Sequence, residues 1–204
     1  MKIDTGKYIH FIDCDVYILK AAYEHCMYIV RYHQPDIVTF NYCKNNKNIE
    51  PSYDLPTPVT GTDFLNNNNL HGAAWSYIFR HSIVGSLQFT PGIVYGEDEE
   101  FTPQLFLRAE RIFKINTEAY FYRDNKNSVS HQYHKEKIQL RMDNSMEVLL
   151  HLQQLLDKIP VADRQALNRR IAQLTMDYKY NNILLNHSLI SVNKGLNKLS
   201  SHGL

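Results

Sequence analysis

The sequence predicts an α/β protein whose mixed sheet is followed by a helical extension. Three observations support this fold class: a short apolar segment at residues 8–12 that ends in acidic residues, a helical pattern with a second apolar segment after it, and leucine-rich helical stripes beyond residue 133. Alternating strands and helices are typical of α/β domains, whereas consecutive helices indicate a separate packed layer. We therefore expect residues 1–133 to form the part that contains the sheet and residues 134–204 to form the helical extension.

The composition limits the classes of protein to which this chain can belong. Its 204 residues include 22 lysines and arginines and 21 aspartates and glutamates, which gives a formal net charge of +1. This balance provides no general attraction to nucleic acid or to an anionic membrane, so we expect no nucleic-acid partner. The chain contains no apolar run of the roughly 20 residues that cross a bilayer, and residues 1–5 lack the apolar region of a signal peptide.

The three cysteines indicate a reducing compartment. Cys14, Cys26 and Cys43 show neither Cys-x-x-Cys spacing nor an even count, so a disulfide framework or a zinc site is not expected. Free thiols are typical of cytosolic proteins. We expect a cytoplasmic protein, located at the inner face of the membrane if its C-terminal helices make peripheral contact with lipid.

The first part of the chain alternates between strand and helix patterns. Residues 8–12 form a nearly continuous apolar run, which predicts a strand buried on both faces. In residues 17–33 the apolar side chains recur at spacings of 4, 3 and 4, which predicts an amphipathic helix that ends before Pro35. Residues 36–41 predict a second strand.

A polar segment separates these elements from the rest of the sheet. Residues 42–72 lack apolar periodicity, so we expect a loop with a short helix near residues 61–65. Asn66 to Asn69 is a low-complexity run, which we expect to be an exposed loop tip. A Pro-Gly pair at residues 91–92 predicts a turn.

The remaining elements follow a run of four acidic residues. Glu97 to Glu100 is expected to open a helix, because acids in a first turn suit the helix dipole, and Phe101 and Leu105 share its apolar face. Two more strands are expected at residues 112–115 and 119–122. Beyond them, the sequence predicts helices that carry stripes at 146–156, 167–178 and 181–199.

Two aspartates one residue apart follow the first predicted strand. In an open α/β sheet the ligand crevice lies outside the carboxyl ends of the strands, so we expect Asp13 and Asp15 at its floor. Carboxylate oxygens suit a divalent cation, which can in turn hold a diphosphate. The alternative is an ordinary acidic turn, because aspartate is common in turns.

Four segments occur in a fixed order along the chain. Residues 6–18 contain the strand that ends in Asp-x-Asp, and residues 74–80 read Ala-Trp-Ser-Tyr-Ile-Phe-Arg. Residues 89–101 end in Glu-Asp-Glu-Glu-Phe, and residues 120–130 begin Tyr-Phe-Tyr-Arg and continue to Ser-Val-Ser. Together they resemble family 2 glycosyltransferases, whose GT-A fold is a Rossmann-like mixed sheet with helices. The likeness covers residues 6–131 and is weaker in the helical tail.

The resemblance implies an inverting glycosyltransferase that transfers a hexose-type sugar from a nucleotide-sugar donor to a glycan or lipid-linked acceptor. It also implies a divalent cation, Mn²⁺ or Mg²⁺, held by Asp13 and Asp15, with His131 as a third ligand. Asp98 would be the general base that takes a proton from the acceptor hydroxyl. The residues that we expect to bind substrate are Trp75, Glu97, Arg80 and Arg123.

The sequence departs from the family pattern in two places. The family's first sheet strands, which hold the nucleotide base and ribose, would precede Gly6 and are absent from this sequence. Asn125 to Asn127 replaces the glycine that the family has before its serine. We therefore expect the C-terminal part of a GT-A domain, whose open sheet edge would be covered by a missing N-terminal half or by a second copy in a homo-oligomer.

Several candidate residues also fit a purely structural position. Trp75 fits the core as well as it fits stacking on a sugar ring, and His131 fits an uninvolved surface position. Arg80 and Arg123 fit carbonyl capping or carboxylate pairing as well as phosphate binding.

The acidic run at residues 97–100 has its own alternative, which is a solvated helix start. We expect Glu99 and Glu100 to be surface charges, and Glu97 to orient the acceptor or to position the turn. Repulsion among four neighbouring carboxylates should raise the pKa of at least one of them.

Two other functions remain open for the chain as a whole. A non-catalytic remnant would serve as an assembly or acceptor-binding module, and the missing nucleotide-binding strands favour it. A metal-dependent phosphohydrolase could use the same carboxylates, but the sequence shows no second cluster of metal ligands to support it.

Overall fold

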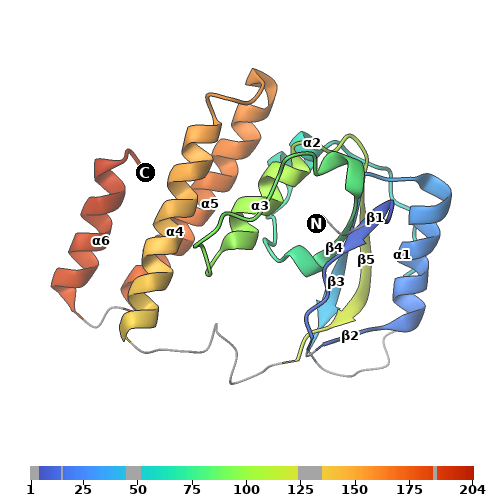
Figure 1. The fold of residues 1–204 in the computed structure, drawn as a ribbon, viewed down its shortest axis with the longest axis horizontal. Helices are drawn as coiled ribbons and strands as arrows, with labels where there is room; N and C mark the ends of the chain where they lie inside the picture. The colour runs from blue at the N-terminus through green and yellow to red at the C-terminus, as the bar shows by residue number, and fades with distance from the viewer. Residues whose placement is uncertain (1–4, 15, 45–51, 124–134, 186–187) are drawn as a thin grey trace. The chain divides into compact units, whose positions relative to one another are not determined.

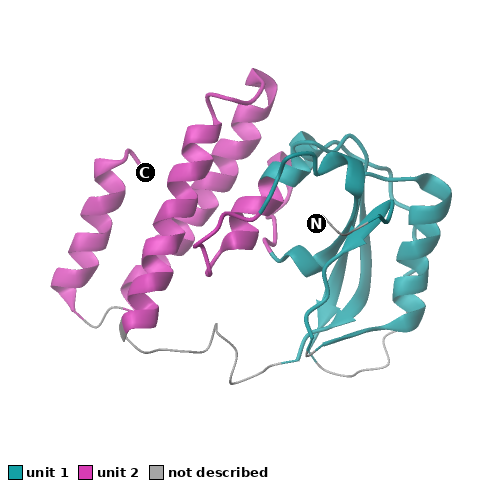
Figure 2. Cartoon of the chain, viewed as in Figure 1, with its two compact units in different colours: residues 1–64, 73–88, 104–125 teal, residues 65–72, 89–103, 126–204 magenta. Residues whose placement is uncertain are grey.

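A computed structural model describes residues 5–14, 16–44, 52–123, 135–185 and 188–204. The chain forms two compact units, shown in teal and magenta in Figure 2. The first consists of residues 1–64, 73–88 and 104–125, and the second of residues 65–72, 89–103 and 126–204. The expected boundary between residues 133 and 134 falls outside the described residues.

The first unit is built on a mixed sheet of five strands in the order β1-β4-β3-β5-β2 (Figure 1). β3 and β5 run parallel, and the other neighbouring strands are antiparallel. The predicted α/β class with a mixed sheet is confirmed. The strands are β1 (Tyr8–His10), β2 (Tyr17–Ile18), β3 (Ile37–Cys43), β4 (Tyr77–Arg80) and β5 (Ile112–Phe121).

The helix α1 (Lys20–His33) covers the sheet with the apolar stripe that the sequence predicts. Cys26 and Ile29 are fully buried against side chains of β3 and β5. The helix ends at Gln34, which adopts a positive φ of 45° before Pro35. It begins three residues later than predicted, because Tyr17–Ile18 pairs with β5 as the short strand β2.

The first strand differs from its prediction. β1 has three residues and lies at an edge of the described sheet, where it pairs with β4 alone. Ile9 is buried, but Ile12 is 49% exposed, so the run at residues 8–12 is not a strand buried on both faces. A short apolar run is therefore also compatible with an edge strand that buries side chains on one face of the sheet.

The two strands expected at residues 112–115 and 119–122 form one continuous strand, β5. Its pairing with β3 shifts register between Thr39 and Tyr42, which marks a bulge in the ladder. Such a bulge accommodates an extra residue without ending the strand. Asn116 and Thr117, which lie between the two predicted strands, belong to this continuous strand.

Short helices connect the strands, namely α2 (Gly61–Asn67), η1 (Ala74–Ser76), η2 (His81–Ile83) and α3 (Glu97–Phe106). The predicted helix near residues 61–65 and the helix opened by the acidic run are both confirmed. Gly61 is required where it stands, because a Cβ atom there would lie 1.7 Å from the Phe106 carbonyl oxygen. The predicted turn is also present, with the Ile93 N–H donating to the Thr90 carbonyl at 3.3 Å.

The second unit contains α4 (Lys135–Leu155), α5 (Val161–Leu185) and α6 (Leu189–Ser201). The predicted helical extension and its break before Pro160 are confirmed. α5 continues to Leu185, so the third helix begins at Leu189 instead of near residue 181. No helix in the described ranges has both the length and the apolar composition needed to cross a membrane.

The asparagine run is fixed to α5 and is not a simple exposed loop tip. Arg169 donates to the carbonyl oxygens of Leu65 at 2.7 Å and Asn68 at 2.6 Å, and to the side chain of Asn69 at 2.9 Å. Asn66 and Asn67 belong to α2. Three hydrogen bonds from one guanidinium give this polar segment a defined path, which its low-complexity sequence did not indicate.

An ion pair between a buried arginine and a partly exposed glutamate joins α3 to α5 within the second unit. Arg170, which is 4% exposed, pairs with the carboxylate of Glu99 and donates to the Leu70 carbonyl at 2.8 Å. Burial raises the pKa of Glu99, and the charge of Arg170 opposes that rise. The expectation that Glu99 is a surface charge is therefore wrong, and burial outweighs repulsion by neighbouring acids as the cause of its raised pKa.

Gly72 makes room for this ion pair. A Cβ atom at Gly72 would lie 1.9 Å from Oε2 of Glu99, while Thr102 donates to the Gly72 carbonyl at 3.0 Å. The backbone is therefore held in place beside the carboxylate. Glycine is needed because the carboxylate occupies the space of a side chain.

An aromatic cluster in the first unit surrounds His10. Nε2 of His10 lies 2.9 Å from the Trp75 carbonyl oxygen, and Nδ1 lies 3.1 Å from the Tyr23 hydroxyl. A carbonyl oxygen can only accept, so Nε2 carries the proton and Nδ1 accepts from Tyr23 in the neutral ring. The ring also stacks on Tyr23 and meets the edge of Phe40, each at a centroid distance of 5.4 Å. Burial lowers the pKa of His10 below its usual 6.5.

Replacing Gly72 by alanine should destabilise the second unit by displacing Glu99 from Arg170. Loss of a hydrogen bond to a charged group costs about 1.5–3 kcal/mol. Urea denaturation should show a large loss for Gly72→Ala in the wild-type background and a clearly smaller one in a Glu99→Ala background, where the clash is absent. Equal losses in the two backgrounds would contradict the assigned role of Gly72.

Acidification should destabilise the first unit through His10. Its folded-state pKa is lowered, so its contribution to the free energy of unfolding is complete above pH 6.5 and is lost as the pH falls through the folded-state value. Urea denaturation followed by fluorescence of Trp75 should give lower stability at pH 5.5 than at pH 7.5, and a smaller difference in His10→Gln. An NMR titration that places the pKa of His10 at or above 6.5 would refute this prediction.

Candidate functional site

Asp13 lies just beyond β1 with its side chain exposed. Its backbone N–H donates to the hydroxyl of Tyr120 at 3.2 Å, and the Tyr120 ring stacks on Trp75 at 4.5 Å with an interplanar angle of 11°. β5 and the aromatic cluster therefore fix the backbone of Asp13. An anchored backbone with an exposed carboxylate is suited to binding a ligand from solvent.

The other two predicted metal ligands, Asp15 and His131, lie outside the described residues. Within the described ranges, no three His, Cys, Asp or Glu side chains gather in a way that could hold a metal ion. Asp13 supplies the hard carboxylate oxygen that Mn²⁺ and Mg²⁺ prefer, so its chemistry fits such an ion. The metal site formed with Asp15 and His131 stays a prediction.

Trp75 occupies the core position that its sequence allows. It is 9% exposed, with Tyr120 stacked on its ring and the edge of Tyr42 at a centroid distance of 5.1 Å. This packing accounts for the position of Trp75 without a ligand. Stacking of Trp75 on a sugar stays a prediction.

The two predicted arginines take different positions in the first unit. Nε of Arg80 lies 3.1 Å from the Asp36 carboxylate, and its guanidinium also donates to the Pro35 carbonyl at 3.0 Å and covers the ring of Tyr8. Carbonyl capping and carboxylate pairing therefore describe Arg80 here. Arg123 is exposed after the end of β5.

Glu97 and Asp98 form the first turn of α3 and are both partly exposed. The loop before them is fixed by Asn144 of α4, whose side-chain oxygen accepts from the N–H groups of Val94 at 3.0 Å and Tyr95 at 3.3 Å. Asn144 is 5% exposed, so water competes little for these bonds. The position of Asp98 within the second unit is thus set by α4.

Glu100 is a second anchor of α3 and not the surface charge that we expected. It is 7% exposed, and one of its carboxylate oxygens lies 2.9 Å from Nδ1 of His151 on α4. The next residue, Phe101, stacks on Phe89 at a centroid distance of 4.5 Å. Glu99 and Glu100 of the acidic run therefore both contact side chains of the C-terminal helices.

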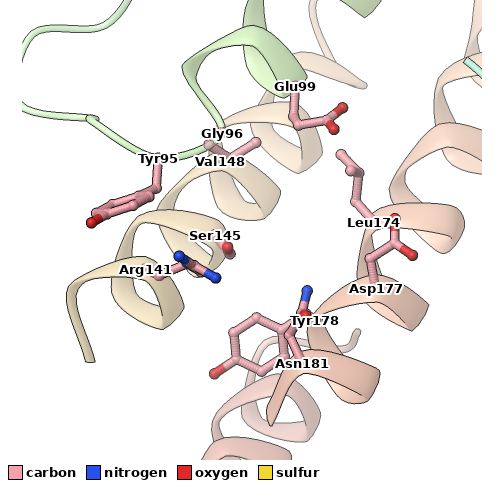
Figure 3. A pocket seen from close by; sticks show the side chains of 10 residues that line it. All are labelled: Tyr95, Gly96, Glu99, Arg141, Ser145, Val148, Leu174, Asp177, Tyr178 and Asn181. Atoms are coloured by element: carbon pink, nitrogen blue, oxygen red, sulfur yellow. The ribbon is translucent and has the colours of Figure 1, made fainter. Parts of the chain in front are cut away.

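A pocket of about 340 Å³ adjoins the start of α3 within the second unit (Figure 3). Tyr95, Gly96 and Glu99 form its α3 side. The residues that α4 and α5 contribute to its wall are Arg141, Ser145, Val148, Leu174, Asp177, Tyr178 and Asn181. Figure 3 shows Arg141 and Ser145 extending from α4 towards the space that Leu174 and Asp177 reach from α5.

Sequence reasoning did not identify this pocket. Arg141 and Ser145 are four residues apart on α4, and Asp177 and Asn181 are four apart on α5, so each pair shares a helix face. On each helix this polar pair continues the line of the apolar stripe, which is the pattern in the sequence that could have indicated a pocket. The leucine stripes alone were used to interpret both helices as packing elements, so the polar pairs were not considered.

Comparison with known proteins gives one related sequence and several related folds. The chain matches no protein-family model. It is 25% identical over 142 residues to the protein described as uncharacterized glycosyltransferase EpsJ of Bacillus subtilis (strain 168). The matched region covers 64% of this chain and 41% of EpsJ. The chain also resembles crystal structures of TarS from S. aureus.

The structure of TarS 1-349 in complex with UDP-GlcNAc superposes with a TM-score of 0.72 at 18% identity and covers 98% of this chain and 58% of TarS. A second structure of TarS 1-349 gives a TM-score of 0.68 at 19% identity, with 97% and 56% coverage. The chain thus spans less than two thirds of the length of each of these relatives. Almost the whole of this chain therefore has the fold of a glycosyltransferase, as its sequence segments implied.

Proposed function

We propose that this chain is the acceptor-side part of an inverting glycosyltransferase of the GT-A type, family 2. It would transfer a hexose-type sugar from a nucleotide-sugar donor to a glycan or lipid-linked acceptor. The observation that carries the proposal is the fold likeness over 98% of the chain to TarS 1-349, a protein crystallised with UDP-GlcNAc. The sequence likeness to EpsJ supports the same class of activity.

Asp98 is the proposed general base. Direct displacement at an anomeric carbon requires removal of the proton from the attacking hydroxyl as the new bond forms. Asp98 lies in the first turn of α3 and is partly exposed, while Glu99 and Glu100 beside it pair with Arg170 and His151. Asp98 is chosen because it stands at the Asp of the Glu-Asp-x-x-Phe segment by which residues 89–101 resemble family 2 glycosyltransferases.

Asp13 and Asp15, with His131, would hold a divalent cation, Mn²⁺ or Mg²⁺. Such an ion supplies counter-charge for the phosphates of the departing nucleoside diphosphate. The exposed carboxylate of Asp13 and its backbone hydrogen bond to Tyr120 support a binding role for this segment. Arg123, which is exposed beyond β5, is the described arginine best suited to contact phosphate.

Asp98→Asn should abolish most sugar transfer while leaving the fold intact. Loss of a general base lowers a rate by about 10²- to 10⁴-fold. The measurement is release of UDP from UDP-GlcNAc in the presence of Mn²⁺ and of cellobiose or lactose as the hydroxyl acceptor, for wild type and variant. Asp157→Asn, which alters an exposed aspartate between α4 and α5, is the matched control and should retain wild-type turnover.

A non-catalytic remnant predicts a different result. In that case neither UDP nor GDP, each with Mn²⁺, would raise the melting temperature of the wild-type chain, because no ligand would bind its folded state. Equal turnover in wild type and Asp98→Asn would likewise reject Asp98 as the base.

A further inference from the structure

The facing surfaces of α4 and α5 change character along their length. Over most of the helix pair these surfaces are apolar, with Leu149 and Leu152 on α4 and Leu167 and Ile171 on α5 all buried. Near the start of α3 they become polar and surround the 340 Å³ pocket. The side chains that replace the apolar stripe there are Arg141, Ser145, Asp177 and Asn181. Polar residues on facing helix surfaces reduce apolar burial, so a ligand is a reason for them to be there.

The charges in this wall are balanced. Arg141 contributes a positive charge and Asp177 a negative one, while Glu99 is paired with Arg170. A nucleoside diphosphate carries at least two negative charges and would meet one arginine beside two carboxylates. The balance instead favours a ligand without net charge.

The hydrogen-bonding groups of the wall suit hydroxyl groups. Ser145 and Asn181 can both donate and accept, Asp177 accepts and Arg141 donates.

The size of the pocket sets the size of the ligand. Small-molecule sites commonly measure about 300–1,000 Å³. A pocket of about 340 Å³ is at the lower end of that range, which suits one or two sugar rings and excludes a longer chain from full enclosure. A longer glycan would place only its terminus inside.

We infer that this pocket binds the uncharged, hydroxyl-rich terminus of a glycan acceptor. Gly96 and Glu99 line it, and Asp98 lies between them in sequence, so a sugar held there would be next to the segment that carries the base. Binding of a neutral sugar follows from the pocket itself. The role of that sugar as acceptor rests on the proposed glycosyltransferase function.

The experiment measures binding of neutral disaccharides, cellobiose and lactose, to the full chain by NMR chemical-shift titration. Glucose 1-phosphate and UDP serve as charged probes. Two variants alter the pocket: Asp177→Asn removes a charged acceptor, and Ser145→Leu fills the space. Asp143→Asn is the matched control, because Asp143 lies on α4 outside the pocket wall and pairs with Lys198. Circular dichroism confirms that each variant is folded.

At least one disaccharide should shift the signals of Ser145, Asp177 and Asn181. Its affinity should fall at least tenfold in Asp177→Asn and Ser145→Leu, and remain unchanged in Asp143→Asn. The inference is overturned if neither disaccharide shifts these signals, if both pocket variants bind as wild type does, or if the charged probes bind there more tightly. Disaccharide binding without any UDP release would reject the glycosyltransferase proposal and retain the sugar site. UDP release that is unaffected by both pocket variants would retain the glycosyltransferase proposal and reject the pocket as its acceptor site.

Discussion

Buried polar contacts between α3 and the helices α4 and α5 are the interactions on which the second unit depends. Asn144 holds the loop before α3, Glu100 meets His151, and Glu99 pairs with Arg170. In each contact one member is buried, namely Asn144, Glu100 or Arg170, so removing its partner would leave a buried polar group unsatisfied. The consequence is a fixed first turn of α3, which carries Glu97 and Asp98. A catalytic base gains from such fixation, because its alignment with an acceptor hydroxyl need not be established anew for each substrate.

The acidic run shows why four adjacent carboxylates can have separate roles. Their spacing in sequence is uniform, but each points in a different direction around a helical turn. Glu99 and Glu100 meet basic residues that lie 71 and 51 positions further along the chain. Sequence reasoning had no access to those pairings, since they depend on how α4 and α5 pack. It therefore treated both residues as solvated and found no role for Gly72, whose lack of a side chain admits Glu99.

The elements with strong periodicity could be predicted, and those decided by neighbours could not. α1 and the three C-terminal helices follow from their apolar stripes, and β3 follows from its apolar run. The edge position of β1 and the continuity of β5 depend on strand pairing, which one strand's sequence does not specify. For the site, the Asp13 segment and the start of α3 were recognised from motifs. The pocket between α4 and α5 was not, because its polar residues form no motif and become a site only when two helix faces meet.

The central claim is that contacts with α4 and α5 fix the first turn of α3, which carries Asp98. Amide hydrogen exchange of Glu99 and Glu100, whose N–H groups both donate to the Gly96 carbonyl, tests this most directly when followed by NMR. Exchange should be slow in the wild-type chain and clearly faster in Asn144→Ala, which removes the acceptor that holds the loop before α3. Equally slow exchange in the wild-type chain and in Asn144→Ala would contradict the claim.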